Sequence, residues 1–419
     1  MQNLIKNLIR KPIVFVFIFI LVMQFPMALL REPDSQRRLI ITALGIDRAG
    51  EEYEVSALCF IPIATTNYQK NYKVISAKDE TFIDAVKKIG IYAGKISSLP
   101  HTSIIVVSED IQREGLVECL DHLVRTNNIG NDTVLVGTDT TAKQVLEISY
   151  ELDISSNLSL RNLLSYNFEY IYGNRSNLES FFRGYFSPTK TSMLGFIKMD
   201  NDSGVGPDDA NQGSQDNSMS VSFIPVQNSN STGNSSSSKI LNDGSACVFK
   251  HGKLQMILNP EYIRYYNWFE THSNKSILKI DNYTDSKFKN ASISFQIEQK
   301  PVIYQSDFYG GIPEMTYIIS FVLTLDEVKQ DNYIEDDYHL SQSVYTEEMT
   351  KKIQNKIKQD FAKLIEILRE NKTDILRVYK TFEVQNKQEF LNFLDTLEDK
   401  EDYLRYINFN IVSNVSIKA

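Results

Sequence analysis

Apolar and polar side chains alternate along the chain in ways that predict two regions of mixed strands and helices. In the first region, 39–44 is a short apolar run, and segment 51–63 alternates with period two after a turn at 48–50, which is typical of an antiparallel hairpin. We expect helices from residue 82 and over 109–125, with a strand at 102–108 between them. This succession of strands and helices predicts an α/β layered domain.

A second patterned region follows residue 240. Segment 245–258 holds two strand-like runs that meet at His251 and Gly252. Apolar residues at spacings of three and four predict a long amphipathic helix that begins at Thr346. Alternating positions at 407–411 predict a last strand. An ending of strand, long helix and strand predicts an α+β domain.

The segment between the two regions, 199–240, is rich in Asn, Ser, Asp and Gly and cannot build a core, so we expect a disordered polar linker. The predicted fold class is therefore α+β (mixed α/β) in a multi-domain chain. An N-terminal α/β domain is predicted over 36–198 and a C-terminal α+β domain over 241–419. We leave open whether the second domain divides in two near 330–345.

An uninterrupted apolar segment, 12–30, precedes the first region and carries no charge. Nineteen helical residues span about 28 Å, close to the thickness of a bilayer's hydrocarbon core. A signal cleaved after Ala28 would place Pro26 at a position that prefers a small residue. We therefore expect a single, uncleaved transmembrane helix with residues 1–11 in the cytoplasm and the remaining chain as an ectodomain outside.

Composition and charge narrow the classes of partner. With 42% hydrophobic and 23% charged residues, the chain resembles an ordinary folded protein. Its formal net charge of -9 gives little gain from counterion release, so nucleic acid is not expected as a partner. Cys59, Cys119 and Cys247 lie far apart without a CxxC pair, which predicts small core residues rather than a disulfide framework or a zinc site.

Motifs that carry catalysis or bind a cofactor are not found in the sequence. Asp336 and Asp337 are adjacent, so on a strand they would face opposite ways. The stretch "DNDSG" from Asp200 lacks the closing Glu of a calcium loop. The histidines have no metal-ligand spacing (His101, His122, His251, His272 and His339). We therefore predict no catalytic, cofactor-binding or metal-binding residues, and no cofactor.

Three local features each allow two interpretations. "TALGID" places Gly45 and Asp47 where a binding turn could form, but we favour a hairpin that needs a glycine. His101 could titrate and switch a contact, but we favour a hydrogen-bonded structural histidine. An aromatic cluster could be an interface hot spot, but we favour core packing for most of its members, which are Tyr265, Tyr266, Trp268 and Phe269.

The order of these segments resembles a known family. "DSQRRLIITALGIDRAGEEYEVSALCFIP" is similar to the opening of the Ger(x)C family, including its "ALGID", and "LPHTSIIVVSEDIQREGLVECLDHLVRTNNI" resembles the segment that follows there. "GSACVFKHGKL" resembles a later hairpin of that family, and the helix from Thr346 through "KTDIL" with the last strand resembles its closing unit. The resemblance covers most of 36–198 and 241–419.

Members of this family are the C subunits of GerA-type nutrient germinant receptors of spores. The resemblance implies a non-enzymatic subunit that acts in germination, with its bulk on the outer face of the spore inner membrane. It implies receptor A and B subunits as membrane partners, and it supplies no catalytic residues.

One departure from the family concerns the anchor. Family members usually carry a lipobox cysteine that is acylated, but the matching segment here reads Ala28–Leu29–Leu30–Arg31, and the first cysteine is Cys59. No lipidation residue is therefore predicted, and the retained helix would replace the lipid. The alternative function is an extracytoplasmic solute-binding or adhesion ectodomain, and a spore-wall hydrolase is a third hypothesis.

Overall fold

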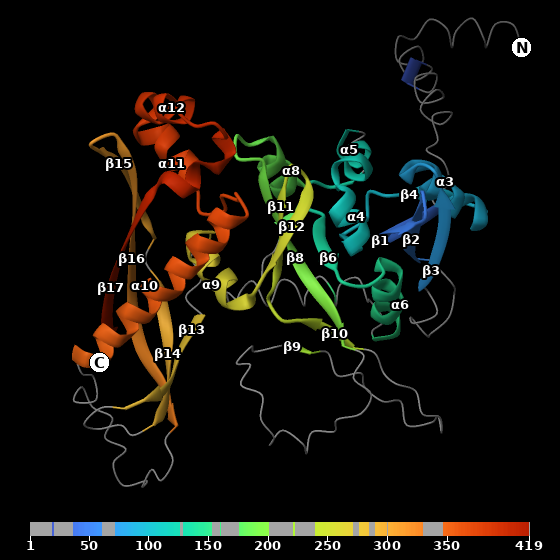
Figure 1. Cartoon of the computed structure of the whole chain (residues 1–419). Coiled ribbons are helices and arrows are strands. Elements are labelled where there is room, and N and C mark those ends of the chain that lie inside the picture. The colour runs from blue at the N-terminus through green and yellow to red at the C-terminus, as the bar shows by residue number, and fades with distance from the viewer. Residues whose placement is uncertain are drawn as a thin grey trace, which may run out of the picture.

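In this computed structural model the chain folds into two β-sheets, and helices cover each of them (Figure 1). The structure describes residues 19–20, 37–60, 72–125, 129–152, 160, 176–200, 221–222, 239–270, 276–284, 290–299, 301–329 and 347–418. The predicted α+β (mixed α/β) class is confirmed by this arrangement of strands and helices.

The first sheet has the strand order β12-β11-β8-β6-β5-β1-β2-β3. Its four middle strands are parallel, and antiparallel hairpins extend it at both edges. The middle strands carry unbroken apolar runs such as "IIVV", because parallel strands are buried on both faces. The strands are β1 (Arg38–Ala49), β2 (Glu52–Phe60), β3 (Tyr72–Asp79), β4 (Ile96–Ser98), β5 (Ile104–Val107), β6 (Val134–Thr138), β7 (Ser176–Asn177), β8 (Thr191–Asp200), β9 (Val221–Ser222), β10 (Lys239–Asn242), β11 (Ala246–Lys250) and β12 (Lys253–Leu258).

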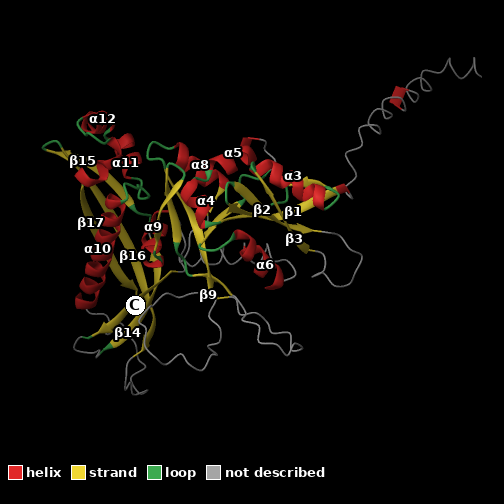
Figure 2. Ribbon diagram, turned by 45° about the vertical axis from the view of Figure 1, so that its right-hand side comes forward, coloured by secondary structure: helices red, strands yellow, loops and turns green. Residues whose placement is uncertain are grey.

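Helices cover both faces of this sheet (Figures 1 and 2). Four of them share the larger core on one face, and α6 closes a smaller core on the other. The single helix predicted over 109–125 is interrupted, because Gly115 has a φ of 132° that a right-handed helix cannot continue through. The helices are α3 (Phe82–Tyr92), α4 (Glu109–Glu114), α5 (Val117–Arg125), α6 (Ala142–Leu152) and α8 (Leu178–Phe186).

The second sheet is built around the long strand β16, whose alternate side chains from Pro313 to Leu323 are buried. Both β14 and β15 pair with β16 in antiparallel fashion, and β17 pairs with it in parallel. One face of the sheet is thus apolar and needs a cover. The strands are β13 (Ser276–Tyr283), β14 (Ala291–Gln299), β15 (Ile303–Tyr309), β16 (Ile312–Lys329) and β17 (Asn408–Lys418).

This face is covered mainly by α10, the long amphipathic helix predicted from residue 346, and by α9, which carries Trp268. Trp268 and Tyr265 meet edge to face in this core, so the core interpretation of the aromatic cluster is confirmed for its buried members, Tyr265, Trp268 and Phe269. The helices are α9 (Pro260–Glu270), α10 (Glu347–Glu370), α11 (Val378–Gln385), α12 (Lys387–Asp395) and the 3-10 helix η5 (Lys400–Tyr406).

Several predictions fall outside the described residues. These are the anchor at 12–30 apart from residues 19 and 20, most of the linker at 199–240, the "DNDSG" stretch after Asp200, the adjacent Asp336 and Asp337, and His272 and His339. In the ranges that the structure does describe, every helix is too short or too polar to cross a membrane. The transmembrane helix and the domain boundaries therefore stay predictions.

Candidate functional site: the hairpin shared by two cores

The hairpin of β11 and β12 belongs to the first sheet, although it lies within the range predicted for the C-terminal domain, 241–419. Strand β11 pairs with β8, so that Cys247 lies opposite Leu194 and Phe249 opposite Ser192. Its other edge carries β12. The chain therefore returns to the first sheet after residues 199–240 before it builds the second.

Side chains of β11 alternate between the two large cores. Cys247 and Phe249 lie in the core under α4, α5 and α8, whereas Ala246 and Val248 lie in the core that α9 and α10 share with the second sheet. We call the first sheet with its helices the first half of the molecule, and the second sheet with its helices the second half. Successive side chains of a strand point to opposite faces, so the short strand β11 packs against both halves. We call this element, residues 246–258, the shared hairpin.

The turn of the shared hairpin is fixed by its own backbone. His251 and Gly252 both have positive φ, at 53° and 77°, as the two-residue turn between right-twisted strands requires. The His251 amide donates to Lys190 O at 3.0 Å, and the Leu116 amide donates to Gly252 O at 3.0 Å. The tip of the hairpin is thereby held against two neighbouring loops of the first half.

Polar side chains at this tip reach the second half. His251 Nε2 lies 2.8 Å from Glu401 Oε1, and Lys250 Nζ lies 3.4 Å from Glu401 Oε2. Lys250 is nearly buried and also donates to the Thr189 carbonyl at 3.0 Å. A buried ammonium needs such partners because the interior does not solvate it.

In the second half, the carboxylate of Asp374 accepts several hydrogen bonds close to the junction with the first half. Its carboxylate accepts from the Val378 amide at 3.0 Å, the Tyr379 amide at 2.7 Å and the Tyr403 hydroxyl at 2.7 Å. Burial raises the pKa of the Asp374 carboxyl, and these hydrogen bonds oppose that rise. Its own amide donates to Thr191 Oγ1 of β8 at 3.3 Å, which joins the two halves.

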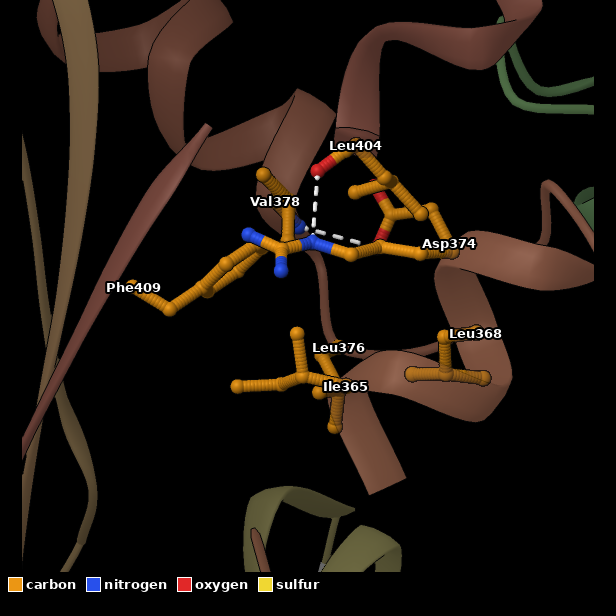
Figure 3. A pocket seen from close by; sticks show the side chains of 8 residues that line it. Ile365, Leu368, Asp374, Leu376, Val378, Leu404 and Phe409 are labelled. Atoms are coloured by element: carbon orange, nitrogen blue, oxygen red, sulfur yellow. Dashed lines mark hydrogen bonds between the residues drawn. The ribbon is translucent and has the colours of Figure 1, made fainter. Parts of the chain in front are cut away.

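Figure 3 shows the hollow beside Asp374, lined mainly by aliphatic side chains. Arg369 also lines it, donates to the carbonyls of Leu404 at 3.0 Å and Ile407 at 2.6 Å, and lies over the Phe409 ring. Only about 10 Å³ of the hollow could be occupied by a water-sized molecule, far below the roughly 300 Å³ from which ligand pockets usually begin. The polar atoms here hold backbone segments in place.

The structure corrects the interpretation of "TALGID". Gly45 lies inside β1 opposite Ser56, not in the hairpin turn, and the turn residue with positive φ is Gly50. A Cβ at Gly45 would lie 3.0 Å from the Cβ of Ala142, so the glycine allows α6 to approach the sheet. Asp47 accepts from the amides of Ala142 and Lys143 at the start of α6. Both residues serve helix packing.

The remaining candidates from the sequence are not brought together. His101 is exposed at a hollow between the turns that precede β5 and β6, which contradicts the expected hydrogen-bonded structural role. The cysteines are buried and free, as predicted (Cys59, Cys119 and Cys247). Burial raises the pKa of Cys59 and of Cys119 to about 12, so both stay protonated thiols. Within the described ranges, His, Cys, Asp and Glu side chains form no cluster of metal-ligand type.

Sequence reasoning missed the two-sided role of the shared hairpin. The signal was present in "ACVF", four residues without a polar interruption, because a strand that is apolar at every position is buried on both faces. Asp374 gave no comparable signal, since its partners Tyr379 and Tyr403 lie on α11 and η5, which local sequence patterns did not predict.

Comparison with known proteins identifies the class. A family model described as "Spore germination protein N-terminal domain" matches residues 32–199, and one described as "Spore germination B3/ GerAC like, C-terminal" matches 244–419. The two matches together define a spore germination protein. The chain belongs to the Ger(x)C family, as the resemblance implied.

Among solved structures, one titled "Crystal Structure of the GerBC protein" is similar. It shares 13% sequence identity with a TM-score of 0.46, and the match covers 90% of this chain and 97% of that chain. No curated protein matches the chain.

Proposed function

We propose that this chain is a non-catalytic, membrane-anchored C subunit of a nutrient germinant receptor. It would sit at the spore inner membrane with its bulk extracytoplasmic and assemble with A and B subunits. Membership in a family of spore germination proteins supports this role. The observation that carries the proposal is the shared hairpin, because a subunit that couples membrane partners needs one body that connects its two halves.

The packing of the shared hairpin supports coupling between the halves. Val248 and Phe249 are fully buried and lie in different cores. Close-packed interiors transmit strain because they contain little free volume. A displacement of α9 against Val248 would therefore move the strand that also carries Phe249.

The hydrogen bonds of the charged side chains at the junction support a structural role. Arg369 and Lys250 donate to backbone carbonyls, and Asp374 accepts from backbone amides. Side chains that are hydrogen-bonded to the backbone in this way stabilise chain segments. Their hydrogen bonds would have to break before the side chains could bind a substrate. The hydrogen bonding of these side chains to the backbone therefore favours a binding or coupling role over that of a spore-wall hydrolase.

Co-purification from dormant spores tests the proposal. The full chain, tagged at its C-terminus, is extracted from spore membranes in mild detergent, and the proteins that accompany it are identified by mass spectrometry. A tagged membrane protein without a role in germination serves as the control. Recovery of A- and B-type subunits with peptides from residues 1–11 of the bait supports the receptor role and the retained anchor.

Recovery of the bait without either subunit contradicts the proposal. It would favour the alternative function, an extracytoplasmic solute-binding or adhesion ectodomain. A bait that has lost residues 1–30 would contradict the anchor while leaving the receptor role to be judged from its partners.

A further inference from the structure

Three large apolar side chains lie exposed together where α3 ends and β4 begins. Their exposed fractions are 73% for Ile91, 65% for Tyr92 and 61% for Ile96. The buried face of α3 is formed by other residues, among them Phe82 and Ile89. Ile91 and Tyr92 therefore occupy the outward side, where an ordinary surface helix carries polar residues. We call residues 91–96 the α3–β4 knuckle.

The knuckle is rigid. The Gly94 amide donates to Ile91 O at 3.0 Å and the Lys95 amide donates to Gly90 O at 2.9 Å, which closes the last turn of the helix. Ser97 Oγ then donates to the Val86 carbonyl at 2.9 Å. The three apolar side chains are consequently held on a fixed protrusion.

The knuckle adjoins the point at which the chain enters the first sheet. Ile96 lies beside Arg38 in the parallel pairing of β4 with β1, and α3 and β4 lie at the start of β1 (Figure 1). The anchor is predicted to end at Leu30, and the eight residues from there to Arg38 reach at most about 29 Å when fully extended. The bilayer surface is therefore within reach of the knuckle.

Its chemistry fits the lipid interface. Aliphatic side chains enter the outer part of the acyl region, and tyrosine and lysine are typical of the headgroup level. Lys95 lies in the turn between Tyr92 and Ile96. The nearby lysines are balanced by carboxylates, since Lys87 pairs with Asp84 and Lys88 with Asp79. Attraction would therefore come from apolar burial rather than from anionic headgroups.

We propose that the α3–β4 knuckle inserts into the outer leaflet surface of the membrane that anchors the chain. This contact would fix the orientation of the first sheet relative to the bilayer and leave the second half pointing away from it. The proposal rests on the membrane anchor of the proposed function.

Site-specific fluorescence on the full chain tests this contact. The variants Tyr92→Cys and Val384→Cys are each labelled with an environment-sensitive fluorophore and reconstituted into phosphatidylcholine vesicles. The native cysteines are buried, so the label attaches at the introduced position. Val384 is the matched control because it is 73% exposed and lies on α11, over the second half (Figures 1 and 2).

The label at position 92 should shift its emission to shorter wavelength and be quenched by lipids that carry a spin label at headgroup depth, whereas the label at 384 should show neither effect. A blue shift without quenching by the lipid would indicate a protein contact, such as a second copy, and would overturn the proposal. Equal emission at both positions would overturn it too. Flotation of the vesicles distinguishes a failure of the anchor from a failure of the knuckle contact. A chain that does not float with the vesicles contradicts the anchor itself.

Discussion

The carboxylate of Asp47, at the end of β1, caps the helix that begins at Ala142. Asp47 Oδ1 accepts from the Ala142 amide at 2.6 Å and Oδ2 accepts from the Lys143 amide at 3.0 Å. Helix N-termini leave such amides without partners inside the helix, and a carboxylate also complements their partial positive charge. The short stretch "GID" thus positions α6 through two contacts. The small size of Gly45 allows the helix to approach the sheet, and the charge of Asp47 caps its first amides.

Removing the cap should destabilise the first half. We expect Asp47→Ala to lower the free energy of unfolding by about 1–2 kcal/mol, because two amides lose their acceptor. Asp47→Asn keeps one oxygen acceptor and should lose less. Urea unfolding followed by circular dichroism measures both variants, and an unchanged midpoint for Asp47→Ala would contradict the capping role.

Adding a methyl group at Gly45 should force α6 away from the sheet. The new Cβ would lie 3.0 Å from the Ala142 Cβ and 3.1 Å from Leu146 Cδ1. We expect Gly45→Ala to cost about 1–3 kcal/mol, as overpacking of a full core usually does. A double-mutant cycle with Ala142→Gly checks the cause, because the combined loss should be smaller than the two single losses added together.

The nearly buried ammonium of Lys250 should matter more than an exposed one on the same hairpin. Lys250→Met keeps most of the side-chain volume but removes the contacts with Thr189 O and Glu401. We expect it to lower the free energy of unfolding by about 1–3 kcal/mol. The control is Lys253→Met on β12, where the side chain is exposed and a change within about 0.5 kcal/mol is expected. Equal losses in both variants would refute this role for Lys250.

Asp374 should give the stability a distinctive dependence on pH. Its folded pKa lies above the ordinary 3.8, so the folded chain binds the proton more tightly than the unfolded chain does. Its contribution to stability is therefore greatest below pH 3.8 and falls as the pH rises through the folded pKa. Asp374→Asn removes this titration.

Urea unfolding of both proteins between about pH 4 and pH 7 measures the difference. The stability of the wild type relative to Asp374→Asn should decrease as the pH rises. A constant difference across this range would show that Asp374 does not titrate there.

Local patterns predicted several of the elements. The helix expected after Thr81 begins at Phe82 because the Thr81 hydroxyl accepts from the Asp84 amide at 3.1 Å, a contact that needs only neighbouring residues. The hairpin of β1 and β2 followed in the same way from its alternation of apolar residues. The mixed fold class could be predicted from such elements alone.

Long-range placement could not be predicted in this way. The function of Gly45 depends on Ala142, which lies far along the chain, so its turn interpretation was wrong although the residue itself was singled out. The pairing of β11 with β8 depends on which edge of the sheet stays open after the other strands have paired. Hydrophobic periodicity gives the buried face of a strand, but it does not name the neighbouring strand.

The parallel pairing of β16 with β17 has a consequence for how the protein is made. Met315 pairs with Phe409, so this edge of β16 stays unpaired until residue 409 has left the ribosome. At ordinary rates of translation the wait lasts several seconds. During that time β16 presents an open row of backbone donors and acceptors. The newly made chain is therefore exposed to aggregation through this edge until β17 has been made.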